Sequence, residues 1–434
     1  MAGTGLEKSL ATQAPALKVA LLGFGTVGSA VARILCDRSA QLPLQLVQVF
    51  NRNVERKRVD WAGSEVEWLH DVEAVLRSDA DIIVELVGGM EPAREWVERA
   101  LKSGKSVVTA NKKLIAQYGP QLTALAARKG VALAYGASVA GGVPVIDALQ
   151  EGLAGDELYK LSGILNGTCN FILTRIESAA VSFDAALREA QQAGFAEADP
   201  TDDVDGFDAR AKLVILTRIG LKAIVRPEQV FCTSIRPLEA VDFIYAHELG
   251  CTIRQISRAE RKDGHIYASV QPALVPIDSP MAHIVGSLNL LISTGKYGGQ
   301  TAFSGHGAGG HSTAVAVVSD LIDIARRSRG DHFRPVADGD TLPVTGNFSS
   351  QYYLRFTVRD RPGIVAAIAS ALACHGINID ALLQKPGFDK DALPFVVTLE
   401  HCTAEQLAAA MSEINQFDFL RGTPLTMPIL TKEL

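Results

Sequence analysis

The stretch LKVALLGFGTVGSAVARILCDR, from Leu17 to Arg38, decides the fold of the first part of the chain. An apolar run rich in leucine and valine precedes the glycines, and residues with helical spacing follow them, so the stretch predicts a strand, a tight turn and a helix. GFGTVG matches GxGxxG, whose glycines allow the turn, the approach of a pyrophosphate and close helix packing. The helix N-terminus adds N–H donors for an anion. We therefore expect a dinucleotide to contact Gly23, Phe24, Gly25, Thr26, Val27 and Gly28.

The pattern downstream of this motif predicts an α/β protein with three domains. Short apolar strands alternate with helices as far as residue 141, which is typical of a Rossmann-type, doubly wound parallel sheet. Longer helices and fewer strands over 142–304 predict an α+β substrate and dimerisation domain, and 305–330 should return to the first domain. Residues 331–350, rich in Gly, Pro and Asp, predict a linker. Residues 351–434 have the strand and helix order of a ferredoxin-like βαββαβ domain.

Composition limits the classes of partner. The 434 residues are 47% hydrophobic and 21% charged, as in ordinary globular cores. A net charge of -6 provides no basic field for nucleic acid or for an anionic membrane, so neither partner is expected. The six cysteines form no CxxC pair, which favours reduced thiols in a cytoplasmic protein over a disulfide framework or a zinc site.

The segment after the second predicted strand bears on cofactor choice. Where an NAD site would carry an acid, the sequence FNRNVERKR places Asn51 and Arg52. An arginine can pair with a 2′-phosphate, and no carboxylate repels that group. The pattern favours NADP over NAD, with a solvated basic loop as the alternative.

A dense acidic stretch, AGFAEADPTDDVDGFDARAK, runs from Ala193 to Lys212 and holds six carboxylates between Glu197 and Asp208. If a helix begins near residue 206, Asp208 and Lys212 share a face at i and i+4. An ion pair on a solvated helix is one interpretation. A calcium loop is excluded, because Thr201 would occupy its first position and Lys212 replaces the bidentate Glu of its twelfth. So much acid beside one amine indicates a site for a small substrate that carries a cation.

Read together with VVTANKKLI and SGILNGTCNFIL, this stretch closely resembles homoserine dehydrogenases. The resemblance extends from about Lys18 to Gln351, and the remaining residues resemble an ACT domain through RDRPGIVAAIASAL and HGINI. The family's constrained positions are occupied by Ala190, Gly194, Phe195, Ala196, Asp199, Pro200, Asp203, Val204, Gly206, Asp208 and Lys212.

The resemblance implies reduction of L-aspartate 4-semialdehyde to L-homoserine with NAD(P)H, a step toward threonine, isoleucine and methionine. By motif position Lys212 would be the proton donor, assisted by Lys112 and Asp208, and Lys112 would lie between cofactor and substrate. We expect the two ammonium groups to lower each other's pKa. Glu197 and Asp208 would hold the substrate's ammonium and hydroxyl groups, with Asp203 supporting them and Lys112 also contacting the substrate. The backbone of Asn166, Gly167 and Thr168 would line the pocket.

The same resemblance implies further contacts. Gly194 and Gly307 would approach the nicotinamide, with a plain glycine hinge as the alternative for each. A structural sodium ion would be bound by the carbonyls of Val139, Gly141 and Val143, although Gly136 stands where the family usually has a glutamate. His306 and His311 have no assigned role.

At the C-terminus, the turn over residues 360–363 would bind an amino-acid effector, with feedback inhibition by threonine, or the ACT domain would serve only for dimerisation. We expect a homodimer or homotetramer. Two rival functions remain: a dehydrogenase acting on another amino aldehyde, and an NADP-binding amino-acid sensor without catalysis.

Overall fold

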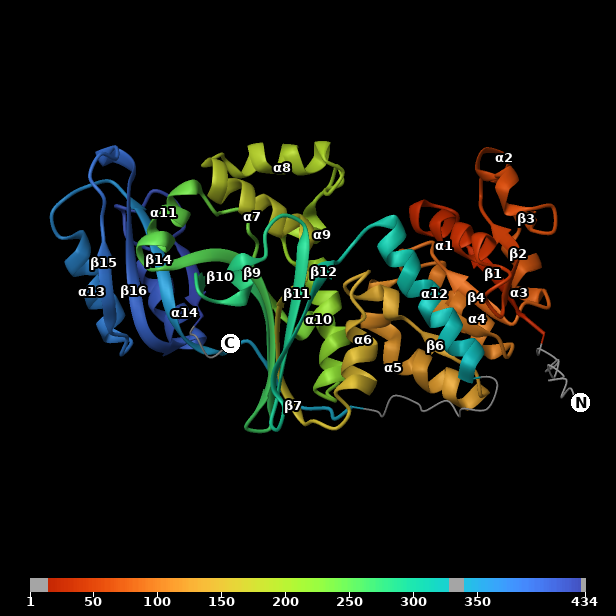
Figure 1. Cartoon of the computed structure of the whole chain (residues 1–434). Coiled ribbons are helices and arrows are strands. Elements are labelled where there is room, and N and C mark those ends of the chain that lie inside the picture. The colour runs from red at the N-terminus through yellow and green to blue at the C-terminus, as the bar shows by residue number, and fades with distance from the viewer. Residues whose placement is uncertain (1–14, 328–338, 431–434) are drawn as a thin grey trace, which may run out of the picture.

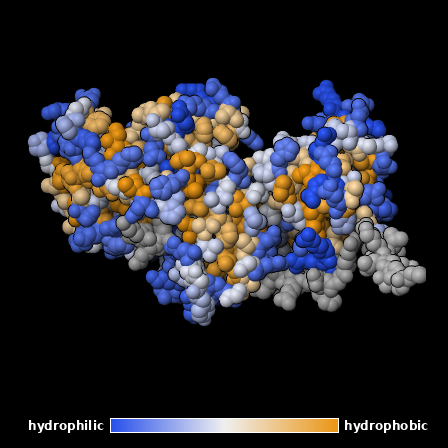
Figure 2. All heavy atoms as spheres, viewed as in Figure 1, coloured by the Kyte–Doolittle hydropathy of each residue, from blue (hydrophilic) through white to orange (hydrophobic). Residues whose placement is uncertain are grey.

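The computed structural model describes residues 15–327 and 339–430. The molecule is elongated, with the N-terminal and C-terminal units at opposite ends and a central unit between them (Figure 1). On the visible face, hydrophobic residues occur in several separate areas among hydrophilic ones (Figure 2). None of the helices in the described part of the chain has the length and apolar character needed to cross a bilayer.

The N-terminal unit contains the predicted parallel sheet, in the order β3-β2-β1-β4-β5-β6. The carboxyl ends of β1 and β4 lie where the strand order reverses, the usual location of a ligand in such sheets. This confirms the Rossmann-type fold. The strands are β1 (Leu17–Leu22), β2 (Leu44–Phe50), β3 (Glu67–Leu69), β4 (Ile82–Glu85), β5 (Ser106–Thr109) and β6 (Leu133–Ala134).

Helices cover both faces of this sheet, because alternate residues of its strands are buried in two different cores. Val19 and Leu21 contribute to a core with α1 and α12, whereas Ala20 and Leu22 contribute to a core with α4 and α5. The packing of α12 on α1 supports the proposed return of residues 305–330 to the first unit. The helices are α1 (Thr26–Asp37), α2 (Val54–Lys57), α3 (Val72–Arg77), α4 (Ala93–Lys102), α5 (Lys112–Lys129) and α12 (Gly310–Arg327).

A second sheet extends through the central unit and into the C-terminal one, in the order β12-β11-β7-β9-β10-β17-β14-β16-β15, with β8 and β13 also paired to β10. Its central strands are β7 (Leu158–Ile164), β8 (Phe231–Cys232), β9 (Cys251–Lys262), β10 (His265–Pro276), β11 (Leu288–Gly295) and β12 (Gly299–His306). The helices of this unit are α6 (Val145–Asp147), α7 (Gly167–Ala179), α8 (Phe183–Gln192), α9 (Thr201–Val204), α10 (Phe207–Gly220) and α11 (Ala240–Glu248).

The C-terminal unit has the predicted βαββαβ order of an ACT domain. Its sheet continues the central one, because Ile429 of β17 pairs with Leu274 of β10. The sequence did not predict this continuity. The elements are β14 (Ser349–Val358), α13 (Ile364–Cys374), β15 (Ile379–Leu383), β16 (Leu393–Thr403), α14 (Ala404–Ile414) and β17 (Leu425–Ile429).

The predicted linker, 331–350, lies partly outside the described residues. Its described half packs on the sheet: β13 (Val344–Thr345) pairs with β10, and Asn347 Oδ1 accepts a 3.0 Å hydrogen bond from the backbone N–H of Glu405 in α14. This segment therefore fastens the C-terminal unit to the central one. We propose domain boundaries at residues 141, 304, 330 and 350.

Substitution of two glycines in the first turn should affect stability to very different degrees. A Cβ at Gly28 would lie 2.3 Å from the carbonyl oxygen of Gly23, whereas a Cβ at Gly25 would have no atom within 4 Å. We expect Gly28→Ala to destabilise the protein by about 1–3 kcal/mol through overpacking, and Gly25→Ala to have little effect on unfolding. Thermal unfolding of both variants beside wild type tests this; an equal loss in the two variants would contradict it.

Candidate active site

Three helix beginnings bring the candidate catalytic residues together. Lys112 opens α5 directly after β5, Asn166 is the N-cap of α7 after β7, and Asp208 and Lys212 lie in the first turns of α10. Helices α5 and α10 pack against each other. Gly119 permits this approach, since a Cβ there would lie 2.5 Å from a guanidinium nitrogen of α10. The site is thus positioned by contact between the first and central units.

Asp208 lies at the centre of the cluster. Its Oδ1 is 2.7 Å from Lys112 Nζ, and its Oδ2 is 2.8 Å from Lys212 Nζ. Asn166 Nδ2 donates to Asp208 Oδ2 at 2.8 Å and to Asp203 Oδ1 at 2.7 Å. The predicted i, i+4 pair is therefore present in a helix, but Asp208 is only 5% exposed and Lys212 only 7%. A solvated surface ion pair does not describe it.

The charges in the cluster compensate one another. Burial by itself would raise the pKa of Asp208, but the ammonium groups of Lys212 and Lys112 outweigh burial and hold that pKa well below its usual range. The nearby Asp208 carboxylate raises the pKa of Lys112 against the opposing effect of burial. The expected mutual lowering of the two lysines is therefore wrong for Lys112, because a shared carboxylate lies between them. Burial, followed by the charge of Asp208, raises the pKa of Asp203.

Lys212 keeps a proton free for a ligand. Its ammonium group donates to the carbonyl oxygen of Leu165 at 2.7 Å and pairs with Asp208. An ammonium group has three N–H bonds, so within the described residues the third is available to a substrate oxygen. A buried lysine with two fixed partners is thereby held in one orientation.

The loop between α8 and α9 adjoins this cluster. Thr168 Oγ1 donates to the carbonyl oxygen of Phe195 at 2.8 Å, which ties the loop to α7. Glu197 is exposed in this loop, and its carbonyl oxygen accepts from Gln191 Nε2 at 3.0 Å. Gly194 has a φ of +77° and open space around it. The structure thus brings Lys112, Asn166, Asp203, Asp208 and Lys212 together, while Glu197 and Gly194 lie on the adjacent loop.

Gly167 has a packing role. A Cβ there would lie 2.6 Å from the carbonyl oxygen of Ser287. The N–H of Cys169 also donates to Asn166 Oδ1 at 2.8 Å, as an N-cap bond. Together these contacts fix the beginning of α7 against Ser287, the residue before β11. Asn166 is therefore held by its own helix while its amide group faces the carboxylates.

The glycine-rich turn has the geometry of a dinucleotide site. Gly23 has a φ of +108°, Gly25 is the N-cap of α1, and open space surrounds the position of a Cβ at Gly25. Arg52 is exposed two residues beyond the last residue of β2, whose Phe50 carbonyl oxygen accepts from the Gly23 N–H at 3.0 Å. Phe24, in contrast, is buried, and the centre of its ring lies 4.8 Å from that of Trp68. Its side chain therefore packs in the core, and only its backbone could contact a dinucleotide.

The loop GHGAGG lies beside the same turn. A Cβ at Gly310 would lie 2.8 Å from Thr26 Cγ2, so this loop rests on the start of α1. Gly307 is buried, and a Cβ there would lie 2.2 Å from Asn289 Cγ. Packing alone therefore requires glycine at 307.

Sequence reasoning missed the residues that orient Lys112. Thr109 Oγ1 donates to Glu85 Oε2 at 2.6 Å, and Glu85 Oε1 accepts from the N–H groups of Val87 and Gly88 at 2.8 and 3.0 Å. The backbone N–H of Asn111 donates to Thr109 Oγ1 at 3.0 Å. This network fixes the loop after β4 and the first turn of α5. A charged residue ending the apolar strand IIVE was the available signal.

The turn expected to bind sodium holds a carboxylate from another helix. Asp320 of α12 accepts from the Gly136 N–H at 2.9 Å, and a Cβ at position 136 would lie 2.7 Å from Asp320 Oδ1. Burial, together with the charge of Asp147, raises the pKa of Asp320 to about 8. The chain thus has an acid from α12 at position 136, where residue 136 itself has no side chain.

A dinucleotide-binding fold joined to a unit in which two lysines share one buried carboxylate defines an NAD(P)-dependent oxidoreductase. Sequence profiles agree: residues 23–136 match the homoserine dehydrogenase NAD-binding domain, 144–322 match homoserine dehydrogenase, and 352–419 match the ACT domain. The homoserine dehydrogenase of Bacillus subtilis is 36% identical over 400 residues, covering 90% of this chain and 92% of that protein. The chain belongs to the homoserine dehydrogenase family.

Solved structures agree with this assignment. A homoserine dehydrogenase from Thiobacillus denitrificans matches with a TM-score of 0.88 and 35% identity, over 95% of this chain and 98% of that chain. A hyperthermophilic archaeal homoserine dehydrogenase in complex with NADPH matches with a TM-score of 0.62 and 27% identity, over 74% of this chain and 99% of that chain.

The depressed pKa of Asp208 predicts a pH-dependent contribution to stability. Such a group stabilises the fold above its unfolded pKa of about 3.9, and this contribution is lost as pH falls through the lower folded value. The stability gap between wild type and Asp208→Asn should therefore be largest near neutral pH and shrink below about pH 4. Denaturant unfolding from pH 3 to 7 measures it, with Asp202→Asn, an exposed acid paired with Lys113, as control. A gap independent of pH would contradict the assignment.

Proposed function

We propose that this enzyme catalyses the reversible, NADPH-dependent reduction of L-aspartate 4-semialdehyde to L-homoserine, with Lys212 as the proton donor. The observation that carries the proposal is the buried Asp208 carboxylate shared by Lys112 and Lys212. It explains why two cations remain together at a site where a negative oxygen would develop during the reaction. In the cell this step would serve the synthesis of threonine, isoleucine and methionine.

When bound, reduced nicotinamide supplies the hydride to the aldehyde carbon. Lys212 then gives a proton from Nζ to the developing alkoxide, and its contacts with Leu165 and Asp208 hold that nitrogen in place. Lys112 keeps its positive charge because Asp208 raises its pKa, so it stabilises the oxygen electrostatically. Asp208 orients both lysines, which is the catalytic role we propose for it.

Carboxylates would hold the ammonium group of the substrate. Asp203 and Asp208 are already oriented by Asn166, and Glu197 on the exposed loop would complete the set if that loop closes over the substrate. Gly167 and Thr168 would shape the pocket through the start of α7. Gly194, with open space around it, and Gly307 would adjoin the nicotinamide.

The preference for NADP is supported by Arg52, which lies next to the glycine turn, and by the NADPH complex of the archaeal relative. We propose that the same site can also bind NAD. A sodium ion would be bound by the carbonyls of Val139, Gly141 and Val143 and by the carboxylate of Asp320, which stands beside that turn. We also propose a cytoplasmic location, a homo-oligomer, and feedback inhibition by threonine through the ACT domain.

Oxidation of homoserine with NADP, followed by absorbance of the reduced nicotinamide, tests the activity directly. Side-by-side rates with other amino alcohols separate homoserine from another substrate, and no turnover at all would favour the sensor alternative. An intact lysine pair argues against a sensor, because a protein that only reads ligand levels needs no proton donor.

Replacing Lys212 by Ala should lower kcat by roughly 100-fold to 10,000-fold, because proton transfer to the alkoxide is lost. Binding of NADPH, measured by fluorescence titration, should persist. Lys113→Ala, which removes an exposed lysine one residue beyond Lys112, is the control and should keep near-native turnover. Near-native kcat in Lys212→Ala would remove Lys212 from the mechanism.

Replacing Arg52 by Ala should raise KM for NADPH far more than KM for NADH, because only NADPH has a 2′-phosphate to pair with the guanidinium. Arg58→Ala, in the same exposed basic segment, is the matched control. Steady-state kinetics with both cofactors measure the ratio. Equal effects on the two cofactors would refute the assignment of Arg52.

A further inference from the structure

Residues 233–242, which we call the connecting segment, run from the end of β8 into the first turn of α11. The segment contacts the acidic helix α9 at one end and the ACT sheet at the other. Ile235 and Leu238 anchor its middle in a core that also contains Cys169 of α7 and Tyr353 of β14. The same hydrophobic core therefore contacts both the start of α7, which carries Asn166, and the ACT domain.

At its first end the connecting segment holds α9 through five polar contacts, one of which is a 3.5 Å hydrogen bond from Arg236 Nη2 to Thr201 Oγ1. Ser234 Oγ donates to Asp205 Oδ1 at 2.6 Å, and Arg236 Nε donates to the same oxygen at 3.2 Å. The N–H of Ile235 donates to the carbonyl oxygen of Val204 at 3.0 Å, and Ser234 Oγ also reaches that oxygen at 3.3 Å. Val204 and Asp205 directly follow Asp203, whose carboxylate faces Asn166, so these contacts fix the position of a candidate substrate ligand.

At its other end the connecting segment is held by one arginine of the ACT domain. Arg355 of β14 donates from Nε to Asp242 Oδ1 at 2.7 Å and from Nη2 to the carbonyl oxygen of Pro237 at 2.9 Å. Its Nη1 lies 3.0 Å from Glu239 Oε1. Tyr353 OH donates to Asp242 Oδ1 at 2.9 Å. Asp242 is fully buried and Arg355 only 6% exposed, so this junction is costly to break.

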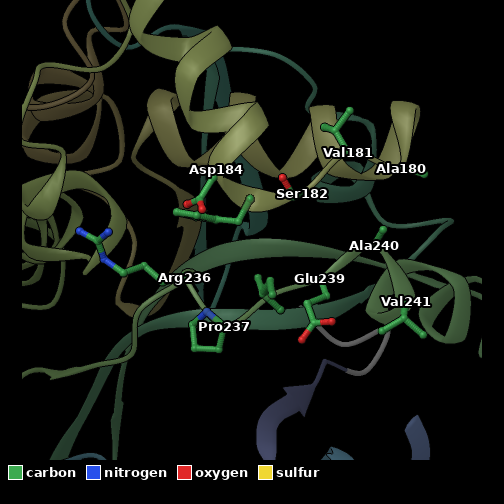
Figure 3. A pocket seen from close by; sticks show the side chains of 11 residues that line it. Ala180, Val181, Ser182, Asp184, Arg236, Pro237, Glu239, Ala240 and Val241 are labelled. Carbon is green, nitrogen blue, oxygen red and sulfur yellow. The ribbon is translucent and has the colours of Figure 1, made fainter. Parts of the chain in front are cut away.

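A cavity of about 580 Å³ lies beside the connecting segment, between residues 236–241 and residues 180–184. Figure 3 shows Ser182 and Asp184 on one side of the cavity and Arg236, Pro237 and Glu239 on the other. Because this side lacks dense packing, the segment depends on its polar contacts and on Ile235 and Leu238 for its position. A small shift of the ACT junction can be accommodated there.

We propose that Arg355 and Arg236 are positioning residues for the substrate site: the ACT sheet holds the connecting segment, and the connecting segment holds α9 and Asp203 in place. A change in the ACT domain then alters substrate binding while the dinucleotide turn, which belongs to the other sheet, is unaffected. The inference rests on the proposed function in one respect, the role of Asp203 in binding the substrate.

The first test is Arg236→Ala, with Arg94→Ala as matched control. The Arg94–Glu98 ion pair has side-chain exposures of 38% and 28%, close to the 42% and 27% of Arg236–Asp205, but it lies in the first unit. Arg236→Ala should raise KM for homoserine roughly tenfold, as expected for loss of a charge-assisted hydrogen bond, with the Kd of NADP unchanged. Arg236→Lys should restore part of the loss. An unchanged KM for homoserine would overturn the proposal.

The second test measures coupling between the two ends. Arg355→Lys keeps the buried charge but loses the forked contacts, and it should also raise KM for homoserine. In the double variant Arg355→Lys/Arg236→Ala, KM should rise no further than in the more affected single variant, because either change releases the same segment. Multiplied effects of the two changes would show that the ends act independently and would overturn the proposal.

Amide hydrogen exchange separates this inference from the proposed function. In Arg355→Lys, the amides of residues 203–205 should exchange faster than in wild type, without any substrate present. This result does not depend on whether Lys212 is the proton donor. Unchanged exchange there would overturn the connection, whereas an inactive wild-type enzyme would overturn only the proposed function.

Discussion

The site depends on one buried carboxylate. Asp208 keeps Lys112 and Lys212 within 2.8 Å of its oxygens, and without it two ammonium groups from different parts of the chain would repel each other at the contact between α5 and α10. The attraction is strong because the carboxylate is shielded from water, and it outweighs the unfavourable burial of the charge. The ion pairs lie where a hydrophobic core shared by α5 and α10 already joins the first unit to the central one.

The two ligand-binding functions are separated in the architecture. The dinucleotide turn belongs to the parallel sheet, where the close approach of backbone atoms requires glycine at 23 and 28 and the space around Gly25 is open. The carboxylates belong to helices that cover the mixed sheet. Lys112 follows β5 of the first sheet but pairs with Asp208 of the second unit, so in the proposed mechanism it would link the cofactor and substrate positions.

The ACT domain is built into the enzyme rather than tethered to it. Its sheet continues the central sheet through Ile429, and Arg355 is buried against Asp242. The ACT domain therefore cannot easily move as a separate module, since breaking this junction would leave a buried charge without its partner. A signal in this domain therefore has a direct physical route to α9 through the connecting segment.

The sequence by itself determined the parallel sheet, the glycine turn, the βαββαβ order and the i, i+4 pairing of Asp208 with Lys212. These features depend on local periodicity, on backbone conformation and on residues close in the chain. Only the tertiary structure decided that Lys112 shares Asp208, that Asp320 of α12 occupies the space beside Gly136, and that the ACT sheet joins the central one. These contacts join residues that lie between about 90 and 180 positions apart in the chain, so no local pattern identifies them. For the same reason, only the tertiary structure shows that Asp208 raises the pKa of Lys112.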